Sequence, residues 1–110
     1  MIFISKKKIF NKQLKRGKFY SVEGHPGMVY KKNDNKNTYY AIVTGTSQAR
    51  HMTKLTHPTD SSVSSSYVKN RPVKGRRKHF GSKELVGMRF HKDDKNLINT
   101  IKRRKPNRLK

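Results

Sequence analysis

Cysteine and tryptophan are absent from this sequence of 110 residues. Without cysteine, disulfide bonds and thiolate zinc sites are excluded, and the redox compartment stays open. Acidic residues are also scarce, with 6 Asp and Glu against 28 Lys and Arg. A nuclease that holds its metal ion with several carboxylates is therefore not expected.

Long apolar runs are missing as well. No segment stays apolar over the length that a membrane-spanning helix needs, and residues 1–10 lack the continuous apolar centre of a signal peptide. We therefore expect a cytoplasmic protein without a membrane partner. The five His residues do not follow the spacing of a metal motif, and the closest pair, His51 and His57, lies six positions apart. The sequence thus predicts neither a metal ion nor another cofactor.

What the chain has in excess is positive charge, with a formal net value of +22. A polyanion relieves self-repulsion of that size, so nucleic acid is the first expected partner, ahead of an anionic membrane and an acidic protein. Lys and Arg concentrate in residues 1–16, 69–78 and 102–110. Such cations contact phosphate oxygens and release counterions, so binding should weaken with salt. The predicted RNA-binding side chains are Arg50, Lys69, Arg71, Lys74, Arg76, Arg77, Lys78 and His79.

Turn-forming residues divide the chain into short β-prone segments. Only 31% of the residues are apolar, so the core must be small. Five or six strands are expected, followed by one helix that begins near Asp93 and Asp94 and ends before Pro106. The expected strands cover residues 17–22, 28–32, 38–44, 52–56, 67–73 and 86–90, with loops at 23–27 and 74–81 and a turn or helix start at 82–85. Pro72 should interrupt the strand at 67–73 with an edge or a bulge.

This pattern predicts a mainly β fold, a small antiparallel β-barrel with one C-terminal helix. Continuous apolar residues at 38–44 indicate a strand that is buried on both faces. Leu97, Ile98 and Ile101 share one face of the expected helix, which should pack on the sheet. We expect a basic N-terminal arm at 1–16, one barrel domain at 17–104 and a basic tail at 105–110.

Three side chains are candidates for chemistry without a metal ion. RNA cleavage needs a group that moves protons, a group that stabilises phosphorane charge and a hydroxyl that positions the phosphate. His25 precedes one apolar strand, and Thr46 and Ser47 follow the next. If the ends of these strands meet, His25, Thr46 and Ser47 form a catalytic site. RNA would then lie in a groove that they share with the ribbon 71–78.

The order of these segments resembles the MazF/PemK-like toxin family. The matching residues are Gly17-Lys18-Phe19-Tyr20, His25-Pro26-Gly27-Met28-Val29, Ala41-Ile42-Val43-Thr44-Gly45-Thr46-Ser47, Met52-Thr53-Lys54-Leu55 and Tyr67-Val68-Lys69-Asn70-Arg71, with the helix after Phe90. The resemblance spans about residues 17–104.

The resemblance implies an SH3-like barrel, a homodimer and a metal-independent endoribonuclease that an acidic antitoxin neutralises. The family's catalytic Arg corresponds to His25, whereas Thr46 and Ser47 match its hydroxyl position. His25 would then transfer protons while a nearby Arg stabilises the phosphate.

Two functions follow from these observations. The first is a toxin-like endoribonuclease that cleaves single-stranded RNA. The second is a non-catalytic nucleic-acid-binding module, either a mobile-element accessory protein or a ribosome-type RNA binder, for which DNA is also a possible ligand. Cleavage of RNA in the presence of EDTA distinguishes them.

Overall fold

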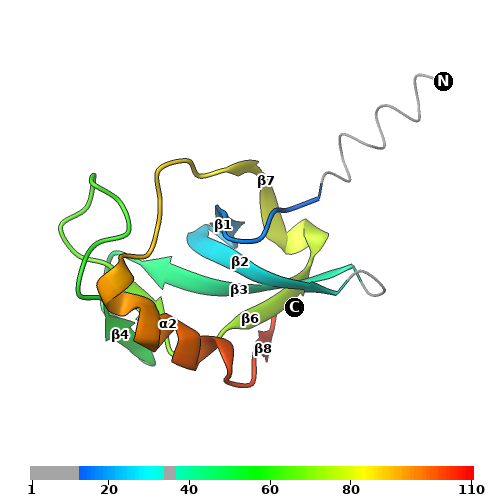
Figure 1. The fold of residues 1–110 in the computed structure, drawn as a ribbon. Helices are drawn as coiled ribbons and strands as arrows, with labels where there is room; N and C mark the ends of the chain where they lie inside the picture. Colours follow the sequence, from blue (N-terminus) through cyan, green and yellow to red (C-terminus); the bar gives the residue numbers. More distant parts are fainter. Residues whose placement is uncertain (1–12, 34–36) are drawn as a thin grey trace.

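The computed structural model describes residues 13–33 and 37–110 (Figure 1). Most of the expected basic arm therefore lies outside the described residues. The elements are β1 (Phe19–Val22), β2 (His25–Asn33), β3 (Thr38–Gly45), β4 (Met52–Lys54), β5 (Tyr67–Lys69), β6 (Val73–Arg76), the 3-10 turn η2 (Arg77–His79), β7 (Phe80–Glu84), the 3-10 turn η3 (Lys92–Asp94), α2 (Lys95–Lys102) and β8 (Asn107–Arg108).

The strands form one sheet in the order β4-β5-β3-β2-β1-β7, with β6 beside β3 and β8 beside β6. All pairings are antiparallel except β6–β8, which is parallel. The predicted mainly β fold with a C-terminal helix is confirmed. Among the described strands no pairing closes the sheet, so the expected barrel closure is not found.

Strands β1 and β2 form a tight hairpin. Val22 pairs with His25, and the two residues between them, Glu23 and Gly24, have φ values of 50° and 87°. Positive φ at both positions is typical of a type I′ turn, whose twist suits two-residue hairpins. The loop predicted at 23–27 is therefore wrong, because β2 already begins at His25.

Strand β3 is the centre of the fold. It is buried on both faces, as its sequence predicts. Tyr39 and Val43 belong to a core that includes Phe80 on one face. Ile42 belongs to a second core on the other face, with Ile98 and Ile101 of α2. The predicted apolar face of the helix is thus confirmed, and Figure 1 shows α2 lying across the sheet near β4.

Several element boundaries differ from prediction. The strand at 67–73 is divided into β5 and β6, as the interruption predicted at Pro72 requires, because Pro72 lacks the amide donor that a continuous ladder needs. Residues 82–84 belong to β7 rather than to a helix start.

The strand predicted at 86–90 is wrong. Val86 is 84% exposed, and Gly87 turns the chain with a φ of 93°. Phe90 instead packs its ring against Phe19, with centroids 5.1 Å apart. In the described part of the chain, no helix has the length and apolar character to cross a membrane.

Candidate nucleic-acid interface

The C-terminal residues are held against the sheet. Strand β8 pairs with β6 in parallel, which sets Lys74 beside Arg108. The amide of Asn107 donates to the carbonyl of Pro72, and the amide of Leu109 donates to that of Lys74, both at 2.8 Å. The Leu109 side chain packs against the core. The segment predicted as a basic tail therefore includes a strand, and it brings the third basic cluster onto the second.

A cavity of about 570 Å³ opens where these two clusters meet. We call it the basic pocket. Its lining includes no Asp or Glu among the described residues. It is lined by the cations Lys74, Arg76, Lys78, Arg108 and Lys110, and by Asn33, Thr38, Tyr40, Gly75, His79 and Leu109. Such a concentration of cations favours a ligand with several phosphates.

His79 lies directly on β6 at the wall of the basic pocket. Its Nδ1 accepts a hydrogen bond from the Arg76 amide at 2.9 Å, so Nε2 carries the proton of the neutral ring. Gly75 permits this contact, because a Cβ there would lie 2.9 Å from Nδ1 of His79 and 2.8 Å from Cδ1 of Leu109. Nε2 is buried and has no hydrogen-bond partner among the described residues. A buried donor without a partner costs about 1–3 kcal/mol, so an acceptor on a ligand would stabilise it.

Tyr40, which lines the basic pocket, belongs to a pair of tyrosines that each lie beside a lysine. The Lys31 ammonium lies 5.0 Å from the centroid of the Tyr40 ring, and the Lys102 ammonium lies 6.0 Å from that of Tyr30. The two rings are 6.2 Å apart. Burial, and secondarily the charge of an ionised Tyr40, raises the pKa of Tyr30 to about 12. Tyr30 is therefore a neutral phenol throughout the physiological range.

The raised pKa of Tyr30 predicts an alkaline loss of stability. The folded state disfavours the phenolate of Tyr30. The contribution of this phenol to the free energy of unfolding is therefore complete below the ordinary pKa of 10.0 and is lost as the pH rises toward about 12. Absorbance at 295 nm, a wavelength at which phenolate absorbs, should show one tyrosine that titrates near 12. Tyr30→Phe should remove that step, and its persistence in this variant would contradict the assignment.

The predicted RNA-binding residues separate into two groups. Lys74, Arg76, Lys78 and His79 line the basic pocket. Arg77 instead donates to the Phe80 carbonyl at 2.8 Å and to the Ser82 hydroxyl at 3.0 Å, so it holds η2 against β7. Arg50, Lys69 and Arg71 are exposed outside the pocket lining.

Sequence reasoning missed three contributors to the basic pocket. Arg108 and Lys110 lie in the segment predicted as a tail, and Tyr40 lies in the strand predicted to be buried on both faces. A signal for the first two existed in the sequence, because Leu109 is an isolated apolar residue among cations. Because successive side chains of a strand point to opposite faces, Tyr39 and Tyr40 lie on opposite faces of β3.

The predicted catalytic residues lie at the other end of β3. Gly27 pairs with Val43, and the Thr44 hydroxyl donates to the Pro26 carbonyl at 3.1 Å. Continued by two residues, this register sets His25 across from Gly45, the neighbour of Thr46. His25, Thr46 and Ser47 are all exposed. The extrapolated register thus points to the same end of β2 and β3 for all three, and a catalytic role for them stays a prediction.

The far end of the ribbon 71–78 lies apart from these residues, and a groove that they share with its start stays a prediction. Arg76 pairs with Thr38 at the first residue of β3, whereas His25 lies near Gly45 at its last. A strand of 8 residues spans about 23 Å at about 3.3 Å per step. A phosphate in the basic pocket would therefore not touch His25, Thr46 or Ser47.

Comparison with protein-family models, with curated proteins and with solved structures finds no match for this chain. The resemblance to MazF/PemK-like toxins, the homodimer and the acidic antitoxin therefore stay predictions from the sequence.

Proposed function

We propose that this protein binds RNA through the basic pocket and the cations around it. The observation that supports the proposal is the pairing of β6 with β8, which gathers five Lys and Arg side chains around one cavity whose lining, within residues 13–33 and 37–110, includes no Asp or Glu. Each cation that contacts a phosphate releases condensed counterions, and this release supplies most of the affinity of a basic protein for nucleic acid.

The lining also offers groups that suit unpaired nucleotides. Tyr40 is half-buried at the pocket, and an aromatic ring beside cations is a surface on which bases stack. The amide of Asn33 and the buried Nε2 of His79 add hydrogen-bonding groups. Single-stranded RNA uses all of these features, whereas a duplex keeps its base faces stacked.

The proposal predicts salt-dependent binding of the full chain to a labelled single-stranded RNA. Fluorescence anisotropy over a series of KCl concentrations should give a linear plot of log K against log salt, with a slope of about −0.7 per phosphate contact. Duplex DNA and single-stranded DNA of the same sequence serve as comparison ligands. A flat salt response would remove nucleic acid as the main ligand.

A second candidate function is RNA cleavage without a metal ion, as in MazF/PemK-like toxins. The observation in its favour is the register of β2 and β3, in which Gly27 pairs with Val43; continued by two residues, it would set His25 across from Gly45, beside the exposed Thr46. His25 would transfer protons, and the Thr46 and Ser47 hydroxyls would position the phosphate.

The two candidates are separated in the same binding reaction. RNA is recovered from the mixture in EDTA and resolved on a denaturing gel. Discrete fragments that disappear in His25→Ala support cleavage, whereas intact RNA leaves binding alone. His51→Asn is the matched control, because His51 is also exposed but has a φ of 65° that Asn tolerates.

A further inference from the structure

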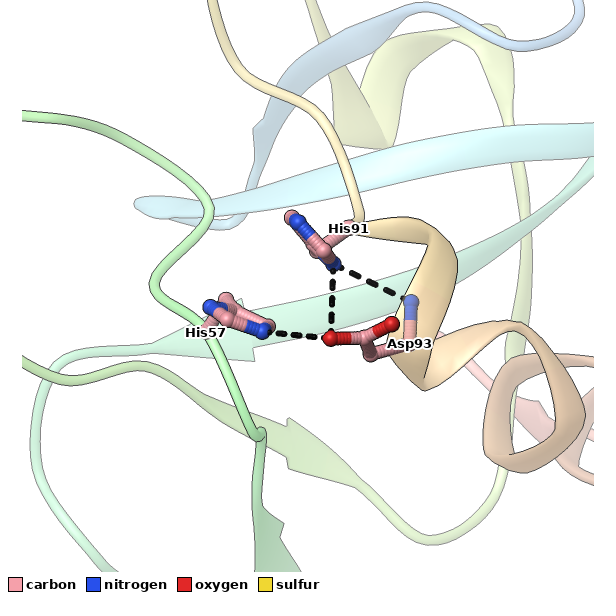
Figure 2. Close-up of side chains that lie close together, drawn as sticks. All are labelled: His57, His91 and Asp93. Atoms are coloured by element: carbon pink, nitrogen blue, oxygen red, sulfur yellow. Dashed lines mark hydrogen bonds and ion pairs between the residues drawn. The ribbon is translucent and has the colours of Figure 1, made fainter.

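Two histidines and an aspartate converge on the side of the molecule where the loop after β4 meets the start of η3. His57 Nε2 lies 2.8 Å from Asp93 Oδ2, and His91 Nδ1 lies 3.5 Å from the same oxygen. The two imidazole rings stack with centroids 3.7 Å apart. Figure 2 shows both rings directed at the Asp93 carboxylate. One ligand atom of each residue lies within 4.8 Å of the other two.

Hydrogen bonds at and beside these residues fix the backbone segments that carry the three side chains. The buried carboxylate of Asp94 accepts hydrogen bonds from the amides of Thr56 and His57, at 2.9 and 3.3 Å. The amide of Arg89 donates to the carbonyl of Thr59 at 3.0 Å, which ties the segment before His91 to the same loop. His57 and His91 are therefore positioned independently of any ligand, as a preorganised site requires.

We propose that His57, His91 and Asp93 bind one divalent transition-metal ion, with Zn²⁺ as the representative. Two imidazoles and one carboxylate are the donor set that Zn²⁺ and its neighbours in the first transition row accept. Zinc bonds of about 2.0–2.1 Å put tetrahedral ligands about 3.3 Å apart. The two pairs that involve Asp93 Oδ2, at 2.8 and 3.5 Å, bracket this spacing, and the ligand nitrogens of the two imidazoles lie within 4.8 Å of each other.

The surroundings favour a cation in spite of the net charge of +22. Of the 6 acidic residues in the chain, Asp93, Asp94 and Asp60 lie at or beside this cluster. A simple ion pair between His57 and Asp93 does not need the shared Oδ2, whereas the His91 imidazole also caps η3. Metal binding would replace the hydrogen bond that His91 Nδ1 accepts from the Asp93 amide at 3.1 Å.

The cluster borders a second cavity, which gives the ion an open position. This cavity of about 540 Å³ is lined by His57 and His91 together with Thr59, Asp60, Met88 and Arg89, among others. Three protein ligands leave the fourth tetrahedral position to water or to an oxygen of another molecule. The basic pocket has no residue in common with this cavity, so the metal site is independent of the proposed RNA-binding surface.

The test is a titration of the full chain with ZnCl₂ after treatment with EDTA and exchange into metal-free buffer. Isothermal titration calorimetry should show one Zn²⁺ per chain. Asp93→Asn and His57→Gln should each weaken binding by about tenfold or more. His51→Asn, which changes an exposed His outside the cluster, should bind like the natural chain. Absent binding, or equal binding in all variants, would overturn the proposal.

A second measurement does not depend on how the variants fold. In the natural chain, the imidazole ¹⁵N resonances of His57 and His91 should shift on addition of Zn²⁺ and return with EDTA. The resonances of His25, His51 and His79 should not move. Shifts at those three instead would show that Zn²⁺ binds elsewhere, and the proposal would be wrong.

Discussion

Replacing Lys74, Arg76 and Arg108 together with Ala should weaken the binding of single-stranded RNA by about a hundredfold at moderate salt. The three cations line the basic pocket, and β6–β8 pairing sets Lys74 beside Arg108. Loss of three phosphate contacts should also lower the salt slope by about 2, because each contact contributes about 0.7 for a single strand. Anisotropy titrations at several KCl concentrations measure both quantities.

The matched control removes three exposed cations that lie outside the basic pocket, namely Lys54, Lys83 and Lys92. Both variants have the same net charge, so long-range attraction to RNA falls equally in the two proteins. Only the loss of local contacts distinguishes them. An equal loss of affinity in the control would mean that binding depends on total charge and not on the pocket.

The parts of the fold that follow from local pattern were predictable. The apolar run in β3 indicated burial on both faces, and α2 packs the predicted Ile98 and Ile101 on the sheet. The alternation of Val86, Met88 and Phe90 led to the wrong prediction of a strand at 86–90, because the same pattern arises when only one of the three side chains is packed. Phe90 contacts Phe19, whereas Val86 is exposed. Alternation alone does not show whether a partner strand is near.

The parts of the sites that depend on pairing between distant segments were not predictable. Strand β8 is formed by Asn107 and Arg108, too short for any periodicity, and it exists because β6 offers a free edge. His57 and Asp93 are 36 positions apart, so no spacing motif connects them. The sequence prediction of no metal site rested on such spacing, which cannot detect side chains that the tertiary structure brings together.

Asp94→Ala should lower the free energy of unfolding by about 2–4 kcal/mol, since each hydrogen bond to a charged group contributes about 1.5–3 kcal/mol. The Asp94 carboxylate is 3% exposed and accepts the amides of Thr56 and His57. Its removal leaves both amides unpaired where the loop after β4 meets α2. Because domains of this size are stable by about 5–15 kcal/mol, the loss is a large share of the total.

Asp93→Ala is the control for this loss, and the comparison isolates burial from charge. Both substitutions remove one carboxylate near the start of α2, so the change in net charge and in the interaction with the helix dipole is similar. The Asp93 side chain is 52% exposed, and its loss should cost less than about 1 kcal/mol.

Unfolding by urea in the presence of EDTA measures the free energy of unfolding of both variants without screening their charges or adding metal. Equal losses would mean that the carboxylates act through charge alone. The two hydrogen bonds that the Asp94 carboxylate accepts from backbone amides would then not be what stabilises the loop after β4. Asp94→Asn should fall between the two, because its amide oxygen accepts one of the two bonds while its amino group faces the other donor.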